Sequence, residues 1–112
     1  MSLENICAIL KSILPDKVFY GTNVYDDGDN ASMPYIVYQE TSKRAIGYGD
    51  NLPLAFSSKI QITLVTKKKN LSLERSLEKA LLDSNISFEV TSEFFNSDKS
   101  INRIYQINME EI

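Results

Sequence analysis

Histidine is absent from this chain of 112 residues, which removes the most common general base and the most common transition-metal ligand. Catalysis would then require paired carboxylates, a lysine, or a serine activated by a lysine. The carboxylates nearest the ends of the expected strands are Glu40, Asp50, Glu89 and Glu93. Each is explained as a solvent-facing residue of a strand or loop, and their spacing does not single out a pair. We therefore expect no catalytic residues, no cofactor and no enzymatic activity.

Cys7 is the only cysteine, so the chain cannot form an internal disulfide, and a reducing compartment is expected. It falls among apolar residues on a short helical pattern, which predicts a small buried hydrophobe rather than a nucleophile. The first residues lack the pattern of a signal peptide, and no apolar run approaches the roughly 20 residues of a membrane span. We expect a soluble cytosolic protein.

Asp26, Asp27 and Asp29 lie close together around a glycine, in a segment from 21 to 32 that is rich in Asn, Asp and Gly. Calcium binds such oxygen-rich loops, but the bidentate glutamate expected downstream is missing. Turn chemistry alone explains the composition of this segment. We interpret it as a solvated acidic loop and predict no metal site.

The segment Lys67–Lys69 is the one concentration of positive charge and has the chemistry to contact phosphate. A lysine run at a strand-to-helix turn is more often a solvated surface that discourages edge aggregation. The formal charge of the whole chain is −3. That charge argues against a dedicated nucleic-acid binder.

A strand and a helix in the middle of the sequence are predicted to position these groups. Across Ser58–Thr66, apolar Ile60, Ile62 and Leu64 alternate with polar residues, as in a strand with one buried face. The period then changes to that of a helix, whose apolar stripe comprises Leu73, Leu77, Ala80 and Leu81. The helix is expected to lie across the apolar face of the preceding strand.

Both ends of this helix carry termination signals. Asn70 or Ser72 can accept a hydrogen bond from a free backbone N–H at the start. At the other end, Asn85 tolerates the left-handed conformation that ends helices, and Ile86 is expected to fold back onto Leu81.

The remaining elements are read from apolar patterns and turn residues. They are a first helix, a short edge strand, a second strand, and a closing hairpin of two strands: Ser2–Leu14, Val18–Gly21, Met33–Glu40, Ser87–Ser92 and Ile101–Glu110. Phe94–Ser100 is expected to connect the last two strands. Thr41–Ala55 contains no evident element, and so long a connection indicates a functional segment, an interface or a hairpin.

These features predict one α+β domain spanning residues 1–112. We expect a mainly antiparallel or mixed β-sheet of about four to five strands with two packed helices, in which a long loop precedes the central strand. Tyrosines 35, 38, 48 and 105 either belong to the core or supply an aromatic interface.

The chain resembles the small tail terminator, or tail completion, proteins of long-tailed bacteriophages and prophages. The resemblance rests on the amphipathic helix ending near Pro15, the strand entry Met33–Tyr38, and the glycine-bearing loop before Lys59–Val65. The helix Leu73–Leu82 and the closing hairpin ending in Tyr105–Met109 complete it. It covers nearly the whole chain as a pattern of residue types, without a catalytic signature.

The resemblance implies a homo-oligomer, a hexameric ring that caps the tail tube at its final length. Such a ring stops polymerisation of the tail tube protein and offers a surface for the head-completion or connector protein, so its place is the host cytoplasm during assembly and then the tail–neck junction of the virion. Exposed strand edges and the Thr41–Ala55 segment are the expected contacts of the ring, since closure requires a heterologous interface. The interface residues we select in that segment are Arg44, Ile46, Tyr48, Leu52 and Leu54.

The same resemblance gives Asp26, Asp27 and Asp29 a second interpretation. DNA passes through the ring without specific binding, and a lumen that carries negative charge would repel phosphate. Two other functions remain open: a head-completion or connector neck protein, and a small cytosolic ligand-binding regulatory module, because an α+β sheet with two helices is a common scaffold.

Overall fold

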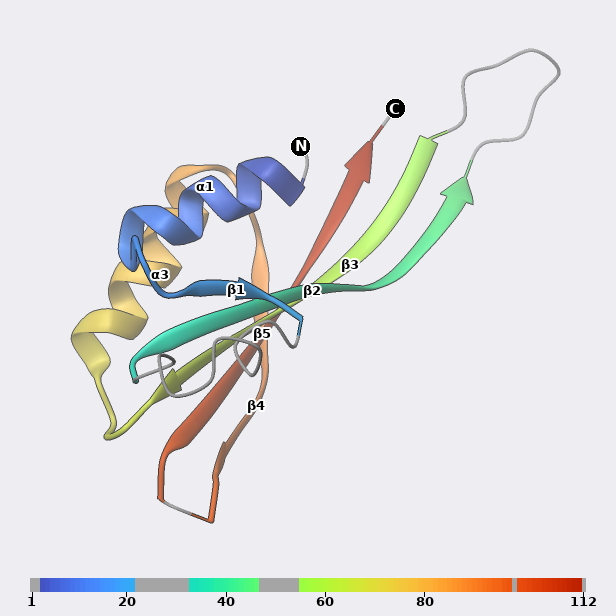
Figure 1. The fold of residues 1–112 in the computed structure, drawn as a ribbon. Helices are drawn as coiled ribbons and strands as arrows, with labels where there is room; N and C mark the ends of the chain where they lie inside the picture. Colours follow the sequence, from blue (N-terminus) through green and yellow to red (C-terminus); the bar gives the residue numbers. More distant parts are fainter. Residues whose placement is uncertain (1–2, 22–32, 47–54, 98, 112) are drawn as a thin grey trace, which may run out of the picture.

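The computed structural model describes residues 3–21, 33–46, 55–97 and 99–111, which form two helices and one five-stranded sheet (Figure 1). The sheet order is β1-β2-β3-β5-β4, with β1 parallel to β2 and every other neighbouring pair antiparallel. Both helices pack on the same face of the sheet, so the expected α+β architecture with a mixed sheet is confirmed. The elements in chain order are α1 (Leu3–Ile13), β1 (Val18–Tyr20), β2 (Tyr35–Ile46), β3 (Ala55–Thr66), α3 (Leu71–Asp83), β4 (Phe88–Phe95) and β5 (Ile101–Glu111).

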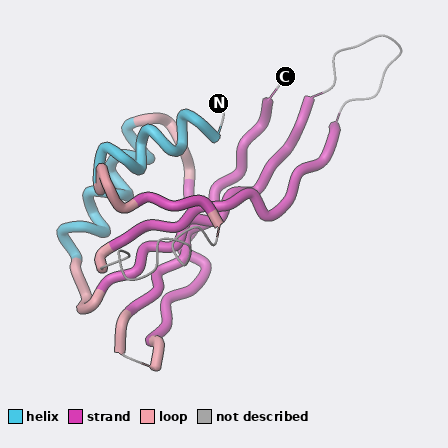
Figure 2. The backbone as a smooth tube through the Cα atoms, viewed as in Figure 1, coloured by secondary structure: helices cyan, strands magenta, loops and turns pink. Residues whose placement is uncertain are grey.

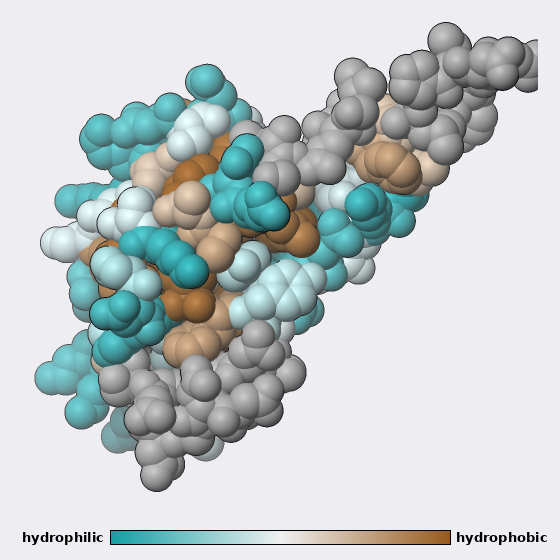
Figure 3. Space-filling model, turned by 45° about the horizontal axis from the view of Figure 1, so that its top comes forward, coloured by the Kyte–Doolittle hydropathy of each residue, from teal (hydrophilic) through white to brown (hydrophobic). Residues whose placement is uncertain are grey.

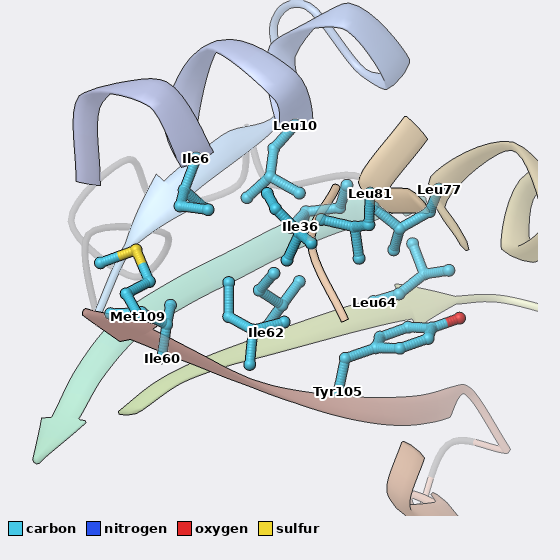
Figure 4. Packing of buried hydrophobic residues seen from close by; sticks show 12 residues of the cluster. Ile6, Leu10, Ile36, Ile60, Ile62, Leu64, Leu77, Leu81, Tyr105 and Met109 are labelled. Carbon is cyan, nitrogen blue, oxygen red and sulfur yellow. The ribbon is translucent and has the colours of Figure 1, made fainter. Parts of the chain in front are cut away.

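Strand β3 lies at the centre of the sheet, between β2 and β5. Its alternation has the predicted effect: Ile60, Ile62 and Leu64 are at most 1% exposed. Two apolar residues of each helix pack against them, and Tyr105 and Met109 of β5 join the same cluster (Figure 4). Full burial of a side chain of this size contributes about 1.5–3 kcal/mol, so this cluster is the main source of stability. The helix residues of the cluster are Ile6, Leu10, Leu77 and Leu81.

The termini of α3 follow the predicted capping chemistry. Leu73 N–H donates to Asn70 Oδ1 at 3.1 Å, so Asn70 and not Ser72 is the N-cap. At the other end Asn85 adopts φ 61°, and Ile86 N–H donates to Leu81 O at 2.9 Å. A second bond joins Asn85 N–H to Leu82 O at 2.9 Å, which completes a Schellman motif.

The prediction of a long connection without an element over Thr41–Ala55 is wrong in part. Strand β2 continues to Ile46, and β3 begins at Ala55, so the two strands form one long hairpin. Polar residues without alternation gave no strand signal there. Cross-strand pairing with β3 overrides the weak intrinsic preference of these residues.

Two further expectations are corrected. Phe94 and Phe95 belong to β4 rather than to a connection, because these aromatic residues suit a strand and the turn itself begins at Asn96. Cys7 is half-buried rather than fully buried. It lies within α1 beside Tyr38, where burial and the hydrogen bond with Cys7 raise the tyrosine pKa to about 12.

Removing the N-cap should lower stability without altering the fold. Asn70→Ala leaves the Leu73 N–H without its acceptor, and we expect a loss of about 1 kcal/mol in the free energy of unfolding measured by urea titration. Asn70→Asp keeps an acceptor at the same place and should stay within about 0.5 kcal/mol of the wild type. Equal losses in the two variants would contradict this role of Asn70.

Candidate functional site: a projecting strand arm

Part of the sheet extends beyond the two helices and forms what we call the arm (Figure 2). The arm consists of Thr41–Ile46 of β2, Ala55–Lys59 of β3 and Asn108–Glu111 of β5, held together by antiparallel pairing, and its base reaches the core at Met109. The molecule is correspondingly elongated, with principal extents of 53 × 29 × 24 Å. The arm is therefore a hydrogen-bonded projection and a natural place for contact with another protein.

The arm begins at a β-bulge. The register of β2 against β3 shifts between Glu40 and Ser42, and the hydroxyl of Thr41 donates to Lys59 O at 3.2 Å. The backbone N–H of Glu40 donates to the hydroxyl of Tyr20 at 3.3 Å, which fastens the base of the arm to β1. Bulges increase the local twist and bend the strand, and Figure 1 shows β2 bending toward the arm.

One face of the arm is polar and basic. Ser42 lies opposite Lys59, and Arg44 lies opposite Ser57, so the four residues share the face that points away from the helices. Together they line a hollow of about 160 Å³. Among the ion pairs of the described residues none involves Arg44 or Lys59, so both cations remain available to an acidic partner.

The opposite face of the arm carries a third cation. Lys43 Nζ lies 4.9 Å from the centre of the Phe56 ring, a cation–π contact between paired strands. The lysine covers part of the Phe56 ring, and the residue remains half-buried. In Figure 3 hydrophobic residues gather over the body, while the arm is mostly hydrophilic with a small hydrophobic region near its far end.

Only part of the predicted site can be placed. Arg44 is an exposed residue of the arm, and Ile46 is the last residue of β2; their role in an interface stays a prediction. The other predicted site residues lie outside the described residues, so their roles stay predictions: Tyr48, Leu52, Leu54, Asp26, Asp27 and Asp29. Asp50 lies there too.

A charged network that the sequence analysis did not identify joins α3 to β4 and β5. Its members are Lys69, Glu74, Glu78, Glu93, Arg103 and Tyr105. The guanidinium of Arg103 lies 3.5 Å from Glu74, 3.3 Å from Glu78 and 3.2 Å from Glu93.

The remaining bonds of the charged network involve Tyr105 and Lys69. The hydroxyl of Tyr105 donates to Glu78 at 2.7 Å and accepts from Arg103 Nε at 2.8 Å. Lys69 Nζ lies 3.0 Å from Glu74 and 2.7 Å from Glu93.

The signal for this network was present in the alternation of β5. Arg103, Tyr105 and Ile107 are two positions apart and share a face of the strand, so Arg103 is a cation on an apolar face that requires a carboxylate partner. Glu74 and Glu78, spaced i and i+4 on α3, supply that partner, and Glu74 is 4% exposed. Sequence spacing cannot show which turn of a helix lies over which strand, so the pairing of Arg103 with Glu74 and Glu78 could be identified only in the three-dimensional structure.

The pKa shifts in the charged network move away from neutrality. The hydrogen bond from Lys69 and the one from Arg103 lower the pKa of Glu93, while partial burial opposes them. The bonds to Glu93 and Glu74 raise the pKa of Lys69, against a smaller effect of burial. A general acid or base works best with a pKa near the operating pH, so these shifts suit a structural ion-pair network.

The lysine run divides between two roles. Lys67 and Lys68 are exposed and help to line a hollow of about 250 Å³ beside Pro34, as a solvated surface predicts. Lys69 departs from that prediction because it joins the charged network. Lys69 differs from Lys67 and Lys68 because Glu74, in the first turn of α3, lies within ion-pair distance of its ammonium group.

Within the described ranges, no group of three or more Cys, Asp or Glu side chains is arranged to hold a metal ion. No helix in this part of the chain has the length and apolar character needed to cross a bilayer.

Comparisons with known proteins find a distant likeness among solved structures but none among families or curated sequences. No protein-family model and no curated protein sequence matches the chain. Among solved structures it is similar to a chain of a particle described as "Virion of native gene transfer agent (GTA) particle", with 11% sequence identity and a TM-score of 0.47. The match covers 92% of this chain and 85% of the other.

Removing Arg103 should destabilise the fold far more than removing an exposed cation. Arg103→Met leaves the nearly buried Glu74 and the adjacent Glu78 with fewer partners, and we expect a loss of about 3 kcal/mol in the free energy of unfolding. Lys79→Met removes the exposed Lys79–Asp83 pair and should cost less than about 0.5 kcal/mol. Similar urea midpoints for the two variants would refute a structural role for the charged network.

Glu93→Gln should lower stability at neutral pH but not in acid. The folded-state pKa of Glu93 lies below its ordinary value of 4.5, so its contribution is complete above that value and disappears as the pH falls through the folded pKa. Because the side chain is 35% exposed, we expect a difference of at most about 1 kcal/mol at pH 7. Urea titrations in dilute solution across this range measure it, with the exposed Asp16→Asn as a control that lacks a described ion pair. A difference that persists unchanged in acid would rule out the ion-pair explanation.

Proposed function

We propose that this chain is a structural protein of a phage or phage-derived particle and acts as a tail terminator. The observation that carries the proposal is the arm, a three-stranded projection with available cations beside a compact two-layer body. A protein whose task is to contact copies of itself and a tube needs such a projecting surface. The resemblance in element order and strand entry supports the same function.

The proposed mechanism depends on asymmetry. Copies of the chain form a ring through heterologous contacts, in which one surface of each copy binds a different surface of the next. One side of the ring copies the docking surface of the tail tube, while the other side rejects a further tube ring and fits the neck. A ring of six copies matches the resemblance, and the loop with Asp26, Asp27 and Asp29 would face passing DNA.

We further propose that the chain has no enzymatic activity. The carboxylates of the charged network are engaged by Arg103 and Lys69, and the shift of the Glu93 pKa is opposite to that of a catalytic acid. The network then serves to hold α3 on the sheet, which keeps the body rigid while the arm makes contacts.

The experiment that tests this function is a tube-capping assay. The purified chain is added to the polymerising tail tube protein of the same genome, and tube length and end structure are measured by negative-stain electron microscopy. We expect shorter tubes that carry one extra ring at a single end. Tubes of unchanged length with bare ends would overturn the proposal.

Light scattering across a concentration series gives a second, independent readout. A six-fold ring, or a monomer that is recruited to tube ends, supports the tail terminator. Binding to the connector but not to the tube would instead identify a head-completion protein. A discrete dimer with a bound small molecule would identify a regulatory module.

A further inference from the structure

Strand β4 forms an open edge of the sheet. It is the last strand in the sheet order and pairs with β5 on one side only. Three apolar side chains are exposed along it: Val90 at 36%, Phe94 at 42% and Phe95 at 74%. A strand edge with exposed apolar residues is a template for pairing with another strand.

The arm supplies a second open edge on the other side of the same sheet. Strand β1 pairs with β2 only from Ile36 to Tyr38, so no described strand covers the edge of Thr41–Ile46. This edge carries Lys43 and Arg44, whereas β4 carries Glu89. The two open edges therefore have opposite charge.

The strand directions make the two edges compatible. Strand β4 is antiparallel to β5, β5 to β3, and β3 to β2, so β4 runs antiparallel to β2. A second copy placed beside the first without being turned over then presents an edge of the correct direction. Both sheets keep their helices on the same side.

The two opposite charges also lie on the same face. Glu89 pairs with Gln106, which pairs with Gln61, and cross-strand partners share a face. Gln61 and Ser57 are four positions apart on β3 and therefore also share that face. Because Ser57 pairs with Arg44, both charged side chains are on the face away from the helices.

We propose that Phe88–Ser92 of β4 in one copy pairs antiparallel with Thr41–Ala45 of a second copy, with Glu89 opposite Arg44. In this register Val90 lies opposite Lys43, and the stem of the lysine can cover the exposed apolar side chain. The contact is heterologous, so it repeats from copy to copy and closes into a ring when the rotation permits. The inference rests on the proposed function for ring closure, but the pairing itself is testable without a tube.

Charged residues on a sheet edge also serve to prevent association, and this alternative predicts a different result. If Lys43 and Arg44 only block pairing, the sign of the charge is unimportant and charge reversal leaves the mass unchanged. If Arg44 attracts Glu89 of a neighbour, reversal of the charge at Arg44 or at Glu89 weakens association, and reversal of both restores it.

The test is a set of charge reversals in the full-length chain, followed by light scattering over a concentration series. We expect the wild type to assemble, and Arg44→Glu and Glu89→Arg each to weaken association by at least about tenfold. The double variant should assemble again. An equimolar mixture of the two single variants should also assemble, because each edge of one variant is complementary to the opposite edge of the other.

Arg75→Glu is the matched control for Arg44→Glu, since it makes the same change in net charge at an exposed position of α3. We expect it to assemble as the wild type does. Circular dichroism checks that each variant is folded. Single reversals that leave assembly unchanged, or a wild type that stays monomeric at every concentration, would overturn the pairing.

The tube-capping assay separates this inference from the proposed function. A chain that caps tubes but does not respond to the reversals refutes the edge pairing and leaves the tail terminator standing. If the chain assembles with the expected effects of the charge reversals but does not cap tubes, the edge pairing is supported and the tail-terminator function is refuted.

Discussion

The fold depends on the burial of one face of β3. This strand is central in the sheet, and its alternate apolar residues contact both helices and the neighbouring strands. Because the side-chain period of a strand is two residues, a slip of one residue would turn the whole apolar set toward solvent. That constraint fixes the register of β2 and β5, and the arm follows from it as the continuation of the same paired strands.

The charged network has a different physical role from the apolar core. Arg103 lies on the helix-facing side of β5, where an unpaired cation would be costly. Carboxylates from α3 and β4 converge on it, and Lys69 links two of them. A buried ion-pair network of this kind is often no more stabilising than apolar residues in place of all its members, but it requires a specific geometry. Because these bonds are directional, the charged network permits fewer positions of α3 along the sheet than apolar contacts alone would.

A rigid body with open edges is well suited to assembly. Natural sheets usually protect their edges, yet β4 exposes apolar residues and no strand of the described ranges covers the backbone of the arm in β2. The edge of β4 and the edge of the arm differ in charge and lie at opposite ends of the strand order. This asymmetry favours head-to-tail contacts over a two-fold dimer, and head-to-tail contacts are the type from which rings are built.

The sequence by itself determined most of the local structure. The alternation of Ile60, Ile62 and Leu64, the apolar stripe of α3 and the capping roles of Asn70 and Asn85 were all predictable, because each depends on residues near in sequence. Tertiary structure alone decided the order of the strands and the meeting of Arg103 with Glu74. It also decided the extension of β2 into the arm. In each case the deciding contact joins segments far apart in the chain, and its free energy comes from pairing and burial that no local pattern encodes.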